Sequence, residues 1–205
     1  MFAQRLDSKK PITYLALGDS YTIGESVPEA ERWPNQLAES LRKKGIELAK
    51  PVIIATTGWR TDNLKNAISV AGLKNDYALV SLLIGVNNQF QGKPADQYAA
   101  EFEDLLKTSI YLASGKKENV FVVSIPDYGY TPFGKSRQST ISAAIDEFNA
   151  INRRITEKQG VQYIDITDIS RRGLDQADLV APDGLHPSAK MYSLWVERIV
   201  RSIVH

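Results

Sequence analysis

The stretch Ile12-Thr13-Tyr14-Leu15-Ala16-Leu17-Gly18-Asp19-Ser20 begins as an apolar run and ends in a short polar turn. Comparable apolar runs recur at residues 52–56, 78–84, 120–125 and 161–166. They are nearly continuous in valine, isoleucine and leucine rather than alternating between apolar and polar residues. Such runs are typical of strands that are buried on both faces of a parallel sheet. We therefore predict five parallel strands, the first of which leads into Ser20.

Helical patterns fill the intervals between these runs. Apolar residues at three- and four-residue spacing predict helices around residues 33–41, 98–110, 141–155 and 191–199, and a weaker helix over 62–71. Strands that alternate with helices predict an α/β fold, in which helices cover both faces of a parallel sheet. The chain of 205 residues shows no internal repeat or linker, so we expect a single domain over residues 1–205.

The overall composition argues against several classes of protein. With 25 basic and 24 acidic residues the formal net charge is +1, which disfavours a nucleic-acid binder that relies on phosphate contacts. No apolar run approaches the roughly 20 residues of a membrane-spanning helix. The first ten residues lack an apolar segment, so we expect no signal peptide. The compartment (cytoplasmic, or periplasmic or secreted if the chain is trimmed) and the oligomeric state stay open.

The turn after the first run and a motif near the end of the chain form a candidate catalytic pair. His186, in Asp183-Gly184-Leu185-His186, is the only histidine besides the terminal His205. A serine hydroxyl needs a base within hydrogen-bond reach to act as a nucleophile near neutral pH, and histidine suits that task. Asp183 is close enough along a turn to orient the imidazole. Ser20, His186 and Asp183 thus form a candidate triad, with Pro187 in the first turn of the last helix.

Two further positions follow predicted strands and can supply hydrogen-bond donors. Gly58 comes after the second run, where a glycine lets the backbone N–H approach a ligand closely. Asn87 comes after the third run, and its side-chain amide can donate to an oxyanion. Together with the N–H of Ser20 they form a candidate oxyanion hole. Each motif alone also fits a turn or a helix cap, and only their joint occurrence at successive strand ends favours a hydrolase.

These motifs, in this order, resemble the four blocks of the GDSL, or SGNH, hydrolase family. Ser20, Gly58, Asn87 and His186 match the blocks one for one, and Asp183 matches the acid of the last block. The resemblance implies a three-layer α/β/α sandwich with a five-stranded parallel sheet in flavodoxin-like order. It also implies a Ser-His-Asp hydrolase of small carboxylic esters that needs no cofactor. The activities that this resemblance suggests are those of esterases, lysophospholipases or carbohydrate O-acetylesterases.

Two positions depart from the family pattern. Tyr21 follows the serine where the family name expects leucine, and Asn88 stands where the third block often has aspartate. The carboxylate that Asn88 replaces is not an oxyanion donor, so this change concerns the hydrogen bonding of its loop. Residues beside the blocks, and the aromatic loop at residues 126–133, are expected to face the substrate, with capping of the sheet as the alternative. The residues expected to face it are Tyr21, Trp59, Asn88, Gln89, Phe90 and Tyr128.

Two other interpretations stay open. The segment from Gly129 to Ser136 fits the P-loop pattern Gly-x4-Gly-Lys-Ser, with Asp165 as a candidate magnesium ligand. A P-loop cradles phosphates with successive backbone N–H groups, however, and Pro132 has none. The second is a non-catalytic flavodoxin-like binding module, against which the single interior histidine argues. With that one histidine and no cysteine we expect no metal site, and no Gly-x-Gly-x-x-Gly motif indicates a dinucleotide.

Overall fold

Five parallel strands form the centre of the molecule. The computed structural model describes residues 11–204, so the first ten residues, where no signal peptide is expected, and His205 lie outside the described part. The strands pair in the order β2-β1-β3-β4-β5. They are β1 (Tyr14–Gly18), β2 (Val52–Ala55), β3 (Leu79–Leu83), β4 (Val120–Val123) and β5 (Gln162–Ile164). This is the flavodoxin-like order, and the prediction of an α/β fold with a five-stranded parallel sheet is confirmed.

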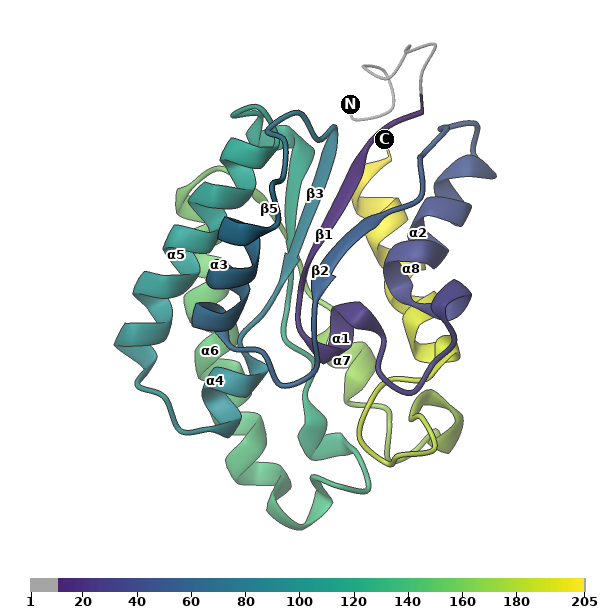
Figure 1. The fold of residues 1–205 in the computed structure, drawn as a ribbon. Helices are drawn as coiled ribbons and strands as arrows, with labels where there is room; N and C mark the ends of the chain where they lie inside the picture. The colour runs from purple at the N-terminus through teal and green to yellow at the C-terminus, as the bar shows by residue number, and fades with distance from the viewer. Residues whose placement is uncertain (1–10, 205) are drawn as a thin grey trace.

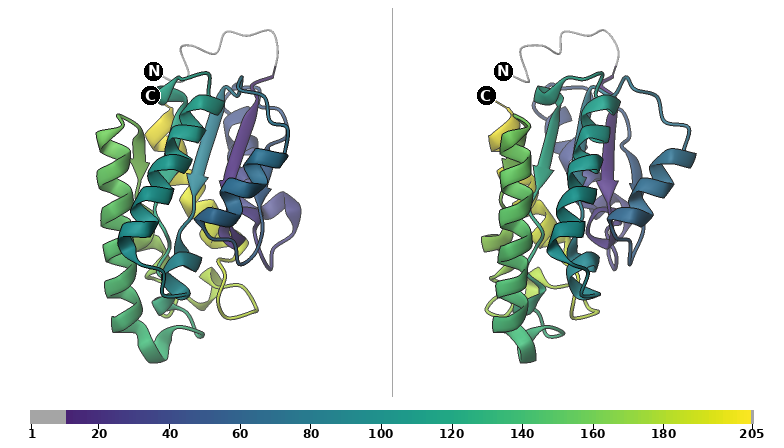
Figure 2. Two further views of the ribbon diagram at one scale, coloured as in Figure 1. Left: turned by 60° about the vertical axis from the view of Figure 1, so that its left-hand side comes forward. Right: turned by 90° about the vertical axis from the view of Figure 1, so that its left-hand side faces the viewer.

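Helices connect the strands. The α-helices are α1 (Ser20–Ile23), α2 (Trp33–Arg42), α3 (Thr61–Val70), α4 (Val86–Phe90), α5 (Ala95–Leu112), α6 (Gln138–Lys158), α7 (Thr167–Ser170) and α8 (Ala189–Ile203). The short 3-10 helices are η2 (Glu29–Glu31), η3 (Lys117–Asn119), η4 (Tyr128–Tyr130), η5 (Lys135–Arg137) and η6 (Ala177–Leu179). Figures 1 and 2 show α2 and α8 on one face of the sheet and α3, α5 and α6 on the other. Within residues 11–204, no helix combines the length and the apolarity that crossing a membrane requires.

The three central strands carry the core. Every residue of β1, β3 and β4 is buried, whereas β2 and β5 are partly exposed because each has a neighbouring strand on one side only. The expected burial on both faces therefore fails at the two edges. Large aromatic side chains anchor both helical layers. Trp33 of α2 packs edge-on against Phe121 of β4, with ring centroids 6.4 Å apart, and Tyr98 of α5 stacks on Phe148 of α6 at 4.5 Å.

The chain leaves β3 through a glycine that lies against α5. Gly85 has a φ of 132°, and a Cβ atom there would come within 2.5 Å of the Tyr98 hydroxyl. The same hydroxyl donates a hydrogen bond to the Ile84 carbonyl at 3.1 Å. Only glycine satisfies both the backbone angle and the close approach. Gly85, the N-cap of the helix α4 that carries Asn87, therefore packs directly against Tyr98.

The entry to α8 differs from the expectation. Ser188 is the N-cap of this helix, because its hydroxyl accepts a hydrogen bond from the N–H of Met191 at 3.2 Å. Pro187 therefore precedes the helix and does not occupy its first turn, so that prediction is wrong. The segment is instead held by a backbone hydrogen bond from the N–H of Ala181 to the carbonyl of His186, at 2.8 Å. His186 thus lies in a loop whose backbone is hydrogen-bonded to the segment around Ala181.

Candidate active site

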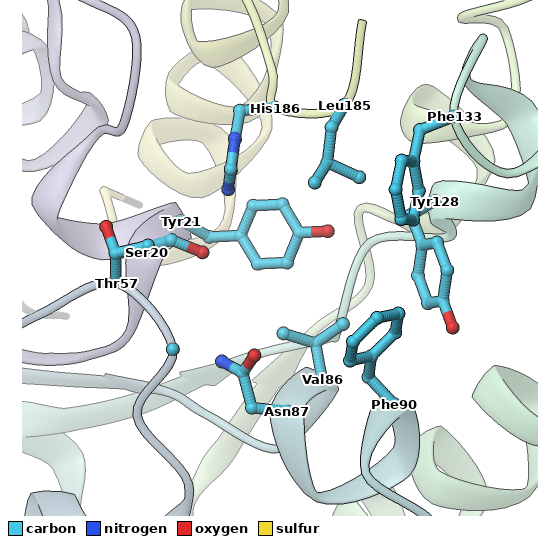
Figure 3. A pocket seen from close by; sticks show the side chains of 11 residues that line it. Ser20, Tyr21, Thr57, Val86, Asn87, Phe90, Tyr128, Phe133, Leu185 and His186 are labelled. Carbon is cyan, nitrogen blue, oxygen red and sulfur yellow. The ribbon is translucent and has the colours of Figure 1, made fainter. Parts of the chain in front are cut away.

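A cavity of about 140 Å³ opens where β1, β2 and β3 end (Figure 3). Ser20 at the start of α1, Gly58 in the loop after β2 and Asn87 in α4 line it from the segments that follow these three strands, and His186 lines it from the loop before α8. Asp183 contacts the imidazole of His186 and is not part of the cavity lining. The fold therefore brings together the five residues that the sequence motifs singled out.

Ser20 is held at a tight turn. Its neighbour Asp19 caps α1, since one carboxylate oxygen of Asp19 accepts a hydrogen bond from the N–H of Tyr21 at 3.0 Å. Ser20 occupies the first helical position, so its own N–H has no partner within the helix. Its hydroxyl faces the cavity in Figure 3 and forms no hydrogen bond with a described residue. Bonds between a nucleophile and its base are often long before substrate binds, so this arrangement is compatible with a triad.

Gly58 and Asn87 present donors to the same cavity. Gly58 has a φ of 82°, in the left-handed region that favours glycine, and its N–H is not hydrogen-bonded to any of residues 11–204. The side-chain amide nitrogen of Asn87 donates to the carbonyl of Trp59 at 2.9 Å, which fixes the Gly58 loop to α4. An amide nitrogen carries two hydrogens, so Asn87 retains one for the cavity.

His186 and Asp183 form a closely hydrogen-bonded pair. Nδ1 of His186 lies 2.6 Å from Oδ2 of Asp183, while Oδ1 accepts from the backbone N–H groups of Leu185 and His186, both at 2.9 Å. An ionised carboxylate can only accept hydrogen bonds, so Nδ1 carries a hydrogen, and in the neutral imidazole Nε2 is the nitrogen with the free lone pair. The ring of Tyr21 packs edge-on against the imidazole, with centroids 5.8 Å apart. These contacts fix both the orientation and the tautomer of His186.

Hydrogen bonds keep Asp183 ionised. Burial alone would raise the pKa of this carboxyl, but four donors outweigh that effect: the hydroxyl of Ser26, the His186 ring, and the N–H groups of Leu185 and His186. They hold the pKa of Asp183 well below its usual range. Asp183 is therefore negatively charged at neutral pH, as the partner of an imidazolium must be.

Asp19 has the opposite environment, although it adjoins Ser20. It is fully buried, and its Oδ2 has no hydrogen-bond partner in the described part of the chain. Burial raises the pKa of Asp19 to about 7, and hydrogen bonds from the N–H groups of Tyr21, Asp19 itself and Gly85 only partly oppose this rise. Asp183 is the carboxylate that contacts the imidazole, so the geometry favours it over Asp19 as the triad acid.

Known proteins share this sequence pattern. The sequence model of the GDSL-like Lipase/Acylhydrolase family matches residues 16–194. The chain belongs to this family. It is also similar to the uncharacterized protein YpmR of Bacillus subtilis (strain 168), with 22% identity over 218 residues, which cover 98% of this chain and 85% of YpmR.

Solved structures share the fold. Axe2, an acetylxylan esterase from Geobacillus stearothermophilus, matches with a TM-score of 0.74 at 18% identity, over 95% of this chain and 94% of the Axe2 chain. The psychrotrophic esterase EstA from Pseudoalteromonas sp. matches with a TM-score of 0.67 at 18% identity, over 93% of this chain and 96% of the EstA chain. The three-layer sandwich that the GDSL resemblance implies is therefore confirmed.

Three residues that were expected to face the substrate of this GDSL-family chain do not line the cavity. The amide of Asn88 is buried, where it accepts from the N–H of Thr61 at 3.1 Å and donates to the Thr61 hydroxyl at 2.6 Å, joining α4 to α3. Trp59 packs its ring against the core and offers only its carbonyl to α4. Gln89 accepts a hydrogen bond from the hydroxyl of Tyr128 at 3.0 Å. These contacts explain why Trp59, Asn88 and Gln89 are absent from the lining.

The side of the cavity away from Ser20 is apolar. Phe90, Tyr128 and Phe133 form a cluster with ring centroids 6.1, 6.3 and 6.4 Å apart, which we call the aromatic wall. Figure 3 shows these three rings across the cavity from Ser20. Tyr21 also lines the cavity, as expected. Sequence reasoning missed three lining residues, each next to a motif residue that it had named: Thr57, Val86 and Leu185.

The segment with the P-loop pattern does not form a phosphate cradle. The N–H groups of Gly134 and Lys135 both donate to the carbonyl of Thr131, at 3.1 and 2.9 Å, and the N–H of Phe133 is bonded to another loop. Pro132 has no N–H. The donors that would hold a phosphate are thus used within the protein, which disfavours nucleotide binding here. Within residues 11–204, no cluster of three or more histidine, aspartate or glutamate side chains could hold a metal ion.

We predict that Asp19→Asn flattens the pH dependence of stability between about pH 4 and 7. In the unfolded chain this carboxyl ionises near pH 4, whereas in the folded protein its pKa is about 7. The folded state then holds more protons within this window, so stability falls as the pH rises, by up to about 1.4 kcal/mol per pH unit. Urea unfolding of both proteins from pH 4.5 to 7.5 measures the difference. Parallel stability curves would show that the prediction is wrong.

Proposed function

We propose that this chain hydrolyses carboxylic esters, with Ser20 as the nucleophile, His186 as the base and Asp183 as the acid that orients the base. One observation carries the proposal: Ser20, His186 and Asn87 share one cavity, and behind it the imidazole is hydrogen-bonded to an ionised carboxylate. Membership of a family of lipases and acylhydrolases supports it. The esterases Axe2 and EstA, which share the fold, lend further support.

The reaction that these groups support has two halves. Oγ of Ser20 attacks the ester carbonyl carbon while Nε2 of His186 takes the hydroxyl proton, and Asp183 stabilises the resulting imidazolium. The tetrahedral intermediate then expels the alcohol, which receives the proton from His186, and the acyl group stays on Ser20. Water attacks this acyl-enzyme by the same route, which releases the acid and regenerates Ser20.

Negative charge develops on the carbonyl oxygen in both halves of the reaction. The N–H of Ser20, the N–H of Gly58 and the second amide hydrogen of Asn87 are the proposed donors to it. Asp19 lies beside this site, and its burial favours the neutral form through the raised pKa. The raised pKa keeps part of the Asp19 population neutral near pH 7, which reduces the negative charge next to the oxyanion.

The apolar side of the cavity suits the acyl group of the ester. An apolar cavity of about 150 Å³ holds benzene, so a cavity of about 140 Å³ accommodates about six carbon atoms. A longer chain would emerge between Phe90 and Phe133, which are 52% and 48% exposed. We therefore propose an acyl chain of about six carbons as the preferred group.

An acetylated carbohydrate, the substrate class in the name of Axe2, is the alternative within the same reaction class. An acetyl group would fill only part of the cavity. Binding of a sugar also needs polar groups that reach its hydroxyls. The hydroxyl of Tyr128 is already bonded to Gln89, and the remaining wall consists of the apolar side chains of Phe90 and Phe133. These features favour a fatty acyl ester.

The role of Asn87 provides a direct test of the catalytic proposal. Asn87→Ala removes one oxyanion donor and should lower kcat on an activated ester by about 10²–10³. Ser20→Ala defines the background rate. The free energy of unfolding should change by no more than about 1.5 kcal/mol, since one hydrogen bond is lost. Turnover like that of the wild type would contradict the assignment of Asn87.

Asn88→Ala is the contrasting variant to Asn87→Ala. Asn88 makes two buried hydrogen bonds to Thr61 and does not line the cavity. Its loss should therefore appear chiefly as destabilisation of about 1–3 kcal/mol, because the donor and acceptor of Thr61 are left unpaired. Urea unfolding of both variants separates the two roles.

The acyl group can be tested with p-nitrophenyl esters, which share one leaving group. We expect kcat/KM to rise at least about tenfold from acetate to hexanoate, because each buried methylene contributes about 0.8 kcal/mol. The rise should level off for longer chains. Phe133→Ala should reduce the rate with hexanoate and leave the rate with acetate nearly unchanged.

Tyr111→Ala, which removes an exposed aromatic side chain on α5 away from the cavity, is the matched control and should leave the whole series unchanged. The highest kcat/KM with acetate, together with no effect of Phe133→Ala, would favour small acetyl esters and overturn the six-carbon proposal. Activity that survives Ser20→Ala would instead overturn the proposed triad.

A further inference from the structure

We propose that Ser26 is a positioning residue for this reaction, whose hydroxyl holds the carboxylate of Asp183 in place against His186. The inference rests on the proposed function, because it assigns Ser26 a role that acts through Asp183. Ser26 lies in the loop between α1 and η2, six residues after the nucleophile and outside the sequence motifs. Its contact spans 157 positions of the chain.

Ser26 completes the hydrogen bonding of the Asp183 carboxylate. Its hydroxyl donates to Oδ2 at 2.6 Å, and Oδ2 also bonds to Nδ1 of His186 at 2.6 Å. Oδ1 already accepts two backbone N–H groups, both at 2.9 Å. A carboxylate has about four lone-pair positions. Ser26 therefore supplies the only side-chain donor, apart from His186, among the four donors that surround Asp183.

This donor acts on the part of Asp183 that the backbone does not fix. The two backbone N–H groups hold Oδ1, whereas both partners of Oδ2, Ser26 and His186, are side chains. The Asp183 side chain is 31% exposed, so water can compete for Oδ2. A hydroxyl held at hydrogen-bonding distance keeps Oδ2 directed at Nδ1 and stabilises the charged form of the carboxylate.

The backbone of Ser26 adopts an unfavourable conformation to make this contact. Its φ is 66°, in the left-handed region, and within residues 11–204 only Ser114 shares such a value among the residues other than glycine. Glycine is the residue that adopts this conformation at no steric cost. Strained backbone of this kind persists where surrounding contacts require it and is concentrated at functional sites. The hydroxyl contact to Asp183 provides a reason for serine at this position.

The loop that carries Ser26 is joined to the rest of the site on two further sides. The N–H of Glu25 donates to the carbonyl of Ser20 at 3.0 Å, which ties the loop to the nucleophile. The carboxylate of Glu25 accepts a hydrogen bond from the hydroxyl of Thr57, the residue before Gly58. Two adjacent residues thus contact the segments that hold the nucleophile, an oxyanion donor and the acid.

Ser26→Gly is the decisive substitution, because it removes the hydroxyl and relieves the backbone strain at once. We expect kcat on an activated ester to fall about tenfold, the effect of losing a hydrogen bond to a charged group. KM should stay within about twofold, since the substrate cavity does not include Ser26. Ser26→Gly should not lower the free energy of unfolding by more than the loss of one hydrogen bond does. A fall in kcat then cannot be attributed to impaired folding.

Ser114→Gly is the matched control. Ser114 has a φ of 57°, and its hydroxyl donates to the carbonyl of Asn75 at 2.8 Å, away from the cavity. Ser114→Gly, like Ser26→Gly, relieves a positive φ and removes one hydroxyl hydrogen bond. Because Ser114 lies away from the cavity, this variant should leave kcat unchanged. An equal loss of kcat in both variants, or a wild-type kcat in Ser26→Gly, would overturn the proposal.

A double-mutant cycle shows whether Ser26 acts through Asp183. In an Asp183→Ala background, Ser26→Gly should cause no further loss of kcat, because the group that it positions is gone. A full tenfold loss in that background would overturn the proposal. As a second readout, the carboxyl carbon of Asp183, followed by NMR, should titrate at a higher pH in Ser26→Gly than in the wild type. If Asp183→Ala alone retains full activity, the result contradicts the proposed triad itself, independently of the role of Ser26.

Discussion

The parallel pairing of β1 with both β2 and β3 is the constraint on which the candidate site depends. Gly18, the last residue of β1, lies opposite Ala55 of β2 and Leu83 of β3, so the three strands end at one level. Ser20 follows two positions after the end of its strand, Gly58 three and Asn87 four. Strands that run in the same direction deliver these short turns to a single edge of the sheet, at the point where the strand order reverses. The proposed nucleophile and its proposed oxyanion donors can therefore meet there although they are far apart in sequence.

Two aspartates near this edge show how environment assigns different roles to one side chain. Asp183 is ionised because four donors surround it, and it orients His186. Asp19 lies beside Ser20 but is fully buried, one of its oxygens has no hydrogen-bond partner among residues 11–204, and its side chain caps α1. An ionised Asp19 would add a second negative charge beside Ser20, where the oxyanion is proposed to form. The contrast between the two pKa shifts is consistent with a site that stabilises negative charge at the substrate and positive charge on the imidazole.

Most of the fold and the motif residues could be predicted from the sequence, because both leave patterns in short stretches of the chain. Apolar runs mark buried strands, and a residue just past a strand end must lie at the edge of the sheet, so Ser20, Gly58 and Asn87 could be recognised together. The direction of a side chain within a loop depends on partners that are distant in sequence. Asn88 turns toward Thr61 on α3, and Ser26 reaches Asp183, and neither contact leaves a pattern in the local sequence. Pro187 was misassigned because Ser188 proved the better helix cap.

Covalent labelling with a fluorophosphonate measures most directly whether Ser20 is an activated nucleophile. Such a reagent reacts with a serine whose hydroxyl is paired with a base and whose oxyanion is stabilised. Intact-mass analysis and peptide mapping of the full chain should show one adduct, on Ser20. The adduct should be absent from Ser20→Ala and should form more slowly in Asp183→Ala. A folded wild-type protein that acquires no adduct, or acquires it at another residue, would contradict the assignment of this chain as a serine esterase that acts through Ser20, His186 and Asp183.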